Sequence, residues 1–314
     1  MDFRTPVTIT REANTIGYGQ KTVFLGSCFA THMGRKFEYY QLPSSTNPLG
    51  ISFQPTALAR LLERAVEEKP FSEADLICNY GVWNSLEVHS SLGSLAAETT
   101  LGNLNQGLQS LRDNLKQATH LVVTLGTAWV YRYLETGQLV ANCHKIPQRQ
   151  FSKELLLPAE VTESLESLYE LAKTLNPKLR LVFTVSPVRH SKDGMVENQR
   201  SKSHLFAGLG PVLDRPDVTY FPAYELMMDE LRDYRYYERD MIHPNPLAID
   251  FIWERFKQTW ITEADWKTME MVAKIRKGLA HKPFNPESDG HLAFLNKLRE
   301  EMANMINQYP HMNF

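Results

Sequence analysis

The chain has 314 residues, of which 43% are hydrophobic, and its formal net charge is -2. This length and composition suffice for one large core, or for a core with an appendage. The small net charge gives no global field that would favour nucleic acid or an anionic membrane as a partner. The sequence contains no run of about 18 uncharged apolar residues, so we expect no transmembrane helix.

The N-terminal residues, Met1 to Gln20, carry several charges and lack the apolar centre of a signal peptide. The three cysteines, Cys28, Cys78 and Cys143, are too few and too scattered for a disulfide framework, and they suit a reducing compartment. We therefore expect a cytoplasmic protein. Neither a CxxC nor an HExxH pattern occurs, so we expect no dedicated zinc site.

The first predicted strand is the short apolar run Val23–Leu25, and a helix from about Phe29 to Tyr39 follows it. Residues 43–55 are rich in Ser, Asn, Pro and Gly and are predicted to form a loop. Helical periodicity returns at 56–67, where the preceding proline, Pro55, suits the first helical position.

The middle of the chain alternates between the same two kinds of element. An amphipathic helix is predicted at 104–118 and a buried strand at 120–125. Residues 130–133 and 139–142 flank a turn sequence, which predicts a hairpin. A long helix is then expected from about Lys153 to Leu175.

Two further strands, at 179–185 and 218–221, precede helices at 223–230 and 248–259. Buried strands that alternate with helices predict a parallel α/β sheet with helices on both faces. In such sheets the ligand lies beyond the carboxyl ends of the strands. Residues that directly follow different strands are therefore expected to share one rim.

The composition shifts to charged helix formers after Thr262, and a final helix is predicted at 292–307. We divide the chain into a catalytic domain, residues 1–262, and a helical C-terminal extension, residues 263–314. The extension either packs on the core or serves an oligomer contact. The sequence does not separate these two roles, and the oligomeric state is unknown from it.

Three side chains predict a serine hydrolase. Ser27 directly follows the first strand, and Asp240 and His243 lie three residues apart near the last core helix. A serine hydroxyl becomes a good nucleophile when an imidazole removes its proton, and a carboxylate orients that imidazole. The plainer interpretations are that Ser27 caps the helix after it and that the Asp-x-x-His spacing arises by chance. The order of the motifs along the chain favours catalysis.

The run Gly26-Ser27-Cys28-Phe29-Ala30 resembles the signature of the GSCFA family, a bacterial group similar to the SGNH/GDSL hydrolases. The resemblance extends from about Lys21 to Trp260 and includes segments at 47–50, 125–129, 142–145, 186–190 and 240–244. It implies a flavodoxin-like, three-layer α/β/α fold and ester hydrolysis or acyl transfer. It also implies Ser27 as the nucleophile, Asp240 as the orienting acid and His243 as the base.

The resemblance further implies an oxyanion hole with three donors. The first is the backbone N–H of Ser27, and Gly50 is the expected second. The asparagine that SGNH enzymes use as the third is replaced by alanine at position 128, and one missing donor costs roughly a hundred-fold in rate or more. Asn142 is the expected substitute because it ends the hairpin that begins at this rim. Its alternative role is to cap a turn.

Other residues are expected to line the substrate site. Arg189 and His190 follow the third strand and can bind a polar or anionic group, and His190 is a rival base. Cys28 is a rival nucleophile at a helix start, although the residue after Ser27 should turn away from the rim. The remaining predicted substrate-binding residues are Trp83 and His89, which form a wall or pack in the core, His144, which lines the site or is solvated, and Gly126, which follows a strand.

These observations predict an esterase or O-acyltransferase that acts on a carbohydrate or small-molecule ester and needs no cofactor. The alternative is a non-catalytic binding module that keeps the fold, which the missing asparagine at position 128 favours. Nucleotide binding is not supported, because the sequence contains neither GxGxxG nor GxxxxGK[ST].

Overall fold

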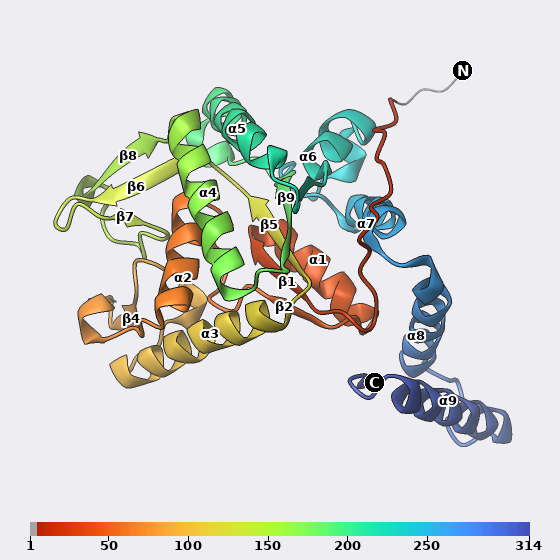
Figure 1. Cartoon of the computed structure of the whole chain (residues 1–314). Helices are drawn as coiled ribbons and strands as arrows, with labels where there is room; N and C mark the ends of the chain where they lie inside the picture. The colour runs from red at the N-terminus through yellow and green to blue at the C-terminus, as the bar shows by residue number, and fades with distance from the viewer. Residues whose placement is uncertain (1–4) are drawn as a thin grey trace.

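Five parallel strands form the centre of the computed structural model, which describes residues 5–314 (Figure 1). They are β1 (Thr22–Gly26), β2 (Ser44–Thr46), β5 (His120–Leu125), β9 (Arg180–Val185) and β10 (Val218–Tyr220). Their order in the sheet is β10-β9-β5-β1-β2. If these five strands are numbered one to five along the chain, the order in the sheet is 5-4-3-1-2. This is the flavodoxin-like order, and the direction in which strands are added reverses between β1 and β5. The predicted α/β fold is confirmed.

Both faces of the sheet are buried. Successive side chains of a strand point to opposite faces, and each face packs against its own apolar core. Val23 and Leu25 belong to one apolar core and Phe24 belongs to the other. The first core packs against α2 (Pro55–Glu67), α3 (Ala97–Gln117), α4 (Pro158–Leu175) and α5 (Met195–Leu209). The second packs against α1 (Cys28–Tyr39) and α7 (Pro246–Trp260) (Figure 1). Burial on both faces explains why these strands are apolar throughout.

A small antiparallel sheet follows β5. It contains β6 (Trp129–Tyr133), β7 (Leu139–Val140) and β8 (Phe151–Leu155), in the order β7-β6-β8. The predicted hairpin is confirmed, but the helix predicted from Lys153 is wrong at its start. Residues 151–155 pair with β6, and α4 begins only at Pro158. Proline suits the first helical position, so it marks the true helix start.

Several elements were not predicted. The predicted loop at 43–55 contains β2, a short strand that pairs with β1 at the sheet edge. A hairpin of β3 (Ile77–Asn79) and β4 (Val82–Asn84) precedes α3. Helix α5 was also missed. The helix predicted at 223–230 consists of α6 (Ala223–Glu225) and a π-helical turn at Leu226–Glu230.

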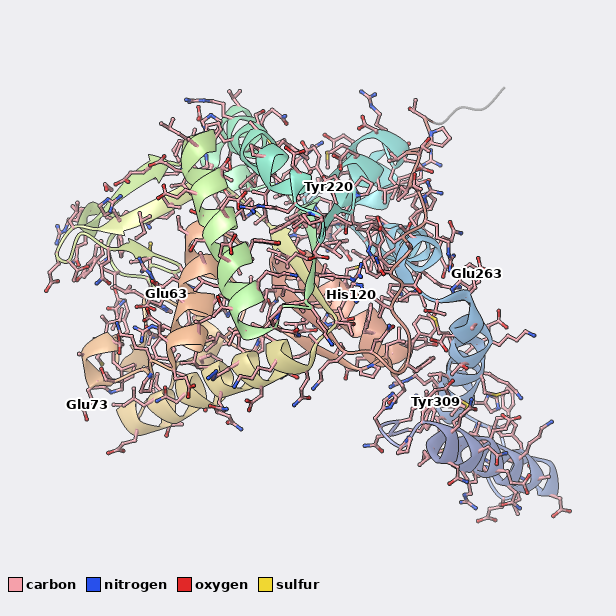
Figure 2. All side chains as sticks on the ribbon, viewed as in Figure 1. Glu63, Glu73, His120, Tyr220, Glu263 and Tyr309 are labelled. Atoms are coloured by element: carbon pink, nitrogen blue, oxygen red, sulfur yellow. The ribbon has the colours of Figure 1, made fainter. Side chains whose placement is uncertain are left out.

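The C-terminal unit, residues 266–314, contains α8 (Trp266–Leu279) and α9 (Asp289–Gln308) and lies beside α1 and the β2 edge of the sheet (Figure 1). Its last residues return to the core. Tyr309, labelled in Figure 2, packs on Tyr18 with ring centroids 4.8 Å apart. The ring of His311 lies 3.1 Å from the carbonyl oxygen of Gln41, measured from Nε2. Across residues 5–314, every helix is too short or too polar to span a lipid bilayer.

A buried ion cluster fixes the segment between α2 and α3. Arg64 of α2 is 5% exposed. It donates hydrogen bonds to both carboxylate oxygens of Glu87, at 2.7 and 2.9 Å, and one to Asp75 at 2.5 Å. Its guanidinium also lies 4.3 Å from the ring centroid of Phe71. The cluster therefore joins α2 to the segment that carries His89.

We expect Arg64→Met to lower the free energy of unfolding by about 3–5 kcal/mol, because the carboxylates of Glu87 and Asp75 would lose their partner while partly buried. Urea denaturation measures this loss. The matched control is Arg200→Met, which breaks a more exposed pair with Glu197 and should cost at most about 1 kcal/mol. Equal losses in the two variants would contradict the interpretation.

Candidate active site

Ser27 lies at the switch point of the sheet, between the end of β1 and the start of α1. Its Oγ accepts a hydrogen bond from the Phe29 N–H at 3.2 Å, so the capping interpretation is confirmed. Ser27 is only 3% exposed, yet it lines a hollow of about 540 Å³, the Ser27 pocket. The cap uses the oxygen as an acceptor and leaves the hydroxyl proton available to a base. Capping and nucleophilic attack are therefore compatible.

A tight turn before α7 assembles the Asp240–His243 pair. One carboxylate oxygen of Asp240 accepts from the backbone N–H groups of Ile242, at 2.9 Å, and His243, at 3.0 Å. The other lies 2.7 Å from Nδ1 of His243. These hydrogen bonds, led by that from the His243 N–H, lower the Asp240 pKa to about 2. The ionised carboxylate therefore favours a proton on Nδ1 of His243 and leaves Nε2 free to act as a base.

Ser27 and His243 line the same pocket, although they are 216 positions apart in the sequence. No hydrogen bond joins the two side chains in the structure of residues 5–314. The imidazole of His243 and the carboxylate of Asp240 are 43% and 47% exposed, so both are accessible to solvent. Ser27, by contrast, is only 3% exposed.

The predicted oxyanion donors are arranged differently from the expectation. The Ser27 N–H donates to the carbonyl of Thr124 at 3.1 Å, and the Gly50 N–H donates to Asn47 at 2.8 Å. Gly50 also lies outside the Ser27 pocket, in a neighbouring hollow. Both predicted backbone donors are therefore occupied. The N–H of Cys28, at the first position of α1, donates to no other residue among residues 5–314, and Cys28 lines the Ser27 pocket, so it is the better backbone candidate.

Asn142 caps a turn, as one of the two interpretations of the sequence predicted. Its Oδ1 accepts from the His144 N–H at 2.9 Å, which caps a turn. Asn142 also lines the Ser27 pocket, and its Nδ2 donates to no acceptor among residues 5–314. An amide held by its oxygen in this way keeps its N–H groups for a ligand.

The floor of the pocket rests on polar side chains of α5, which sequence reasoning missed. Lys202 is fully buried and donates hydrogen bonds to the carbonyls of Gly126 and Ser186, both at 2.8 Å. Ser201 Oγ accepts from the Ala128 N–H at 2.7 Å, and Asn198 accepts from the His190 N–H at 2.8 Å. These bonds fix the loops that follow β5 and β9. Gly126 accepts one of these hydrogen bonds through its carbonyl, and it does not line the pocket, contrary to the prediction.

Comparison with known protein families agrees with the signature at the end of β1. The model described as "GSCFA family" matches residues 21–256. The chain belongs to the GSCFA family. A second model, described as "GSCFA domain protein, C-terminal domain", matches residues 272–314. The predicted division at residues 262 and 263 falls between the two matches. No curated protein matches this chain.

Three of the other predicted substrate-site residues of this GSCFA chain line the Ser27 pocket. They are His89, Arg189 and His190. Trp83 does not line it, because it lies in β4 and pairs through its backbone with Ser94. His144 is also outside the pocket. It is buried rather than solvated, and its Nε2 lies 2.7 Å from the carbonyl oxygen of Ser85.

The structure of this GSCFA site gives less support than the sequence did to His190 as an alternative base and to Cys28 as an alternative nucleophile. Burial lowers the pKa of His190 to about 4, and its ring packs on Phe53 with centroids 5.0 Å apart. Such a low pKa makes His190 a weak base at neutral pH. Burial also raises the pKa of the Cys28 thiol, although its helix start suggested the opposite. In the described part of the chain, no group of three or more His, Cys, Asp or Glu side chains is placed to hold a metal.

Proposed function

We propose that this GSCFA-family protein is a serine hydrolase of the SGNH/GDSL type, an esterase or O-acyltransferase. The observation that carries the proposal is that Ser27 and His243 line one pocket while Asp240 orients the imidazole at 2.7 Å. A pure binding module has no need for a hydroxyl, an imidazole and a carboxylate in this relation. The substrate class we propose is an O-acyl ester, such as an acetyl ester, of a carbohydrate or small molecule.

In the proposed mechanism, His243 Nε2 takes the proton of the Ser27 hydroxyl as Oγ bonds to the acyl carbon. Asp240 stabilises the imidazolium that forms. The N–H of Cys28 and the amide of Asn142 donate to the oxyanion of the tetrahedral intermediate. His243 then protonates the departing alkoxide as its bond to the acyl carbon breaks.

The acyl group is released by the same side chains in reverse roles. Water, or the hydroxyl of an acceptor, loses its proton to His243 as its oxygen bonds to the acyl carbon. The bond between the acyl carbon and Ser27 Oγ then breaks, and His243 returns the proton to Ser27. The first step requires a hydrogen bond from Ser27 Oγ to His243. Catalytic hydrogen bonds are commonly long in the free enzyme and shorten when substrate binds. No step in this scheme uses a cofactor.

We also propose a cytoplasmic location. Cys28, Cys78 and Cys143 all remain free thiols, which suits a reducing compartment. Cys78 is exposed and would be vulnerable to oxidation elsewhere.

A serine-directed fluorophosphonate tests the proposal directly. The wild-type protein should be labelled at Ser27 and should hydrolyse p-nitrophenyl acetate or an acetylated sugar. The second candidate, a non-catalytic binding module, is favoured by one observation, namely that Ser27 Oγ and His243 are not hydrogen-bonded in the free structure. Absence of labelling at Ser27 together with inactivity on these esters would favour the binding module.

The role proposed for Asn142 gives a separate prediction. Asn142→Ala should lower kcat by roughly a hundred-fold, because one oxyanion donor is lost. Asn142→Asp is the matched variant, since it keeps the oxygen that caps the His144 N–H but has no N–H to donate. If Asn142 acts as a donor, both variants lose activity in steady-state assays. An active Asn142→Asp enzyme would reduce Asn142 to a turn cap.

A further inference from the structure

A second and larger hollow of about 880 Å³ lies beside the Ser27 pocket, and we call it the edge pocket. Its walls come from α1, from the loop and strand at 41–51, from the segment at 89–91, and from the C-terminal unit. The residues of the C-terminal unit that line it are Arg276, His311 and Asn313. The C-terminal unit therefore forms one wall of a cavity whose other walls belong to the α/β domain.

The edge pocket is positively charged. Lys21, Arg35 and Arg276 line it, together with the imidazoles of His89 and His311. Glu38 is the one carboxylate among the described lining residues, and none of the three cations forms an ion pair with a carboxylate in residues 5–314. The Arg276 guanidinium instead donates to the backbone carbonyl of Glu38 at 3.1 Å. The whole chain carries a formal net charge of -2, so this cationic cavity is a local feature.

The edge pocket adjoins the proposed site of catalysis. Ile51 and His89 line both hollows. Asn47, in the wall of the edge pocket, accepts a hydrogen bond from the N–H of Gly26, the residue before Ser27, at 2.9 Å. The two hollows are therefore neighbours, and a molecule that occupied both would pass Ile51 and His89.

We propose that the edge pocket is a subsite for the anionic part of an extended substrate, whose ester lies at Ser27. The substrate class is then an O-acylated carbohydrate or polyol that carries a carboxylate or a phosphate. This inference rests on the proposed esterase or acyltransferase function. Arg35 and Arg276 bind the anion, since a guanidinium matches both groups with paired N–H donors. The C-terminal unit thereby acquires a role in substrate selection.

The first test measures binding without turnover. Calorimetry on the full-length Ser27→Ala protein compares trigalacturonate with neutral galactotriose, and galactose 6-phosphate with galactose. We expect at least one anionic probe to bind about 10-fold or more tightly than its neutral counterpart, because charge-assisted hydrogen bonds are stronger than neutral ones. A preference for trigalacturonate indicates a carboxylated substrate, and a preference for galactose 6-phosphate indicates a phosphorylated one.

Charge variants locate the binding. Arg35→Gln and Arg276→Gln, each in the Ser27→Ala background, should raise the dissociation constant of the preferred anionic probe about 10-fold. The matched control is Arg299→Gln, which removes an exposed positive charge from α9 outside the edge pocket and should leave binding unchanged. The proposal is overturned if neutral and anionic probes bind equally, or if Arg299→Gln has the same effect as the other two variants.

The second test separates this inference from the proposed function. Wild-type protein should hydrolyse O-acetylated trigalacturonate or acetylated galactose 6-phosphate with a higher kcat/KM than the matched neutral ester. Arg276→Gln should reduce that ratio mainly through KM. Hydrolysis of both esters at equal rates overturns the subsite and leaves the esterase standing. Absence of hydrolysis and of fluorophosphonate labelling overturns the esterase, and the calorimetry then decides whether an anion site exists.

Discussion

Ser27→Ala is expected to lower kcat for ester hydrolysis by roughly ten-thousand-fold or more, the range found when the nucleophile of a Ser-His-Asp triad is removed. The physical reason is that the acyl-enzyme cannot form without Oγ. Fluorophosphonate labelling should disappear as well. Steady-state kinetics on p-nitrophenyl acetate and mass spectrometry of the labelled protein measure the two effects.

Because Ser27 also caps α1, its loss changes stability, and this effect must be separated from catalysis. Ser27→Ala should cost about 1 kcal/mol of stability, whereas Ser27→Gly should cost only a few tenths, since glycine is tolerated at the cap. Both variants lack the hydroxyl, so both should be inactive if Oγ is the nucleophile. Substantial activity in the stable Ser27→Gly protein would contradict the mechanism.

Cys28→Ala provides the chemical control at the neighbouring position. It removes the thiol but keeps the backbone N–H that we assign to the oxyanion hole. We therefore expect most of the activity to remain. Loss of activity in Cys28→Ala with retention in Ser27→Gly would instead identify the thiol as the nucleophile.

Lys202→Met is expected to have the largest effect on the pH dependence of stability. Burial lowers the pKa of Lys202 from 10.5 to about 7. Among residues 5–314, Lys202 donates hydrogen bonds to the neutral carbonyls of Gly126 and Ser186 and forms no ion pair. The charged form is consequently disfavoured in the folded state relative to the unfolded chain.

The direction of the effect follows from proton binding. Between about pH 7 and 10.5 the unfolded chain holds a proton on Lys202 that the folded protein has lost. Stability then rises with pH, by up to about 1.4 kcal/mol per pH unit and by roughly 5 kcal/mol over the whole window. Below about pH 7 both states are protonated, and the contribution no longer changes.

Urea denaturation of wild type and Lys202→Met at pH 7, 8.5 and 10 measures this contribution. The variant lacks the titrating group, so the stability of wild type relative to the variant should increase with pH. At pH 7, removal of a buried charge stabilises the variant. The carbonyls of Gly126 and Ser186 lose their donor, however, which costs about 1–3 kcal/mol each. Parallel curves for the two proteins would show that Lys202 does not titrate in this window.

The α5 helix shows why part of the site escaped prediction. Its buried positions include Asn198, Ser201, Lys202, Leu205 and Leu209, which follow helical spacing. Several members of this stripe are polar, so a search for apolar periodicity does not detect it. Their burial is possible only because backbone groups of the loops after β5 and β9 accept or donate hydrogen bonds to them. That partnership forms when the sheet and helix pack together.

The predicted start of α4 was wrong for a different reason. Residues 151–157 contain Lys, Glu and Leu, which favour a helix. In the structure, residues 151–155 pair with β6 instead. Tertiary pairing outweighs the small differences in local propensity, which are at most about 1 kcal/mol per residue for ordinary side chains.

By itself, the sequence determined the features that depend on nearby residues. Apolar runs of strand length predicted four of the five strands of the sheet, and the order of strands and helices implied the parallel fold. The Asp240–His243 pair was readable because a three-residue spacing in a tight turn brings both side chains together through local hydrogen bonds.

Only the tertiary structure decided which groups remain available to a ligand. Pairing of β1 with β5 occupies the Ser27 N–H, and a turn occupies that of Gly50. Packing of the C-terminal unit against α1 and the sheet edge creates the edge pocket. The physical reason is that a hydrogen-bonding group or a charge changes its role once distant segments supply, or fail to supply, its partner.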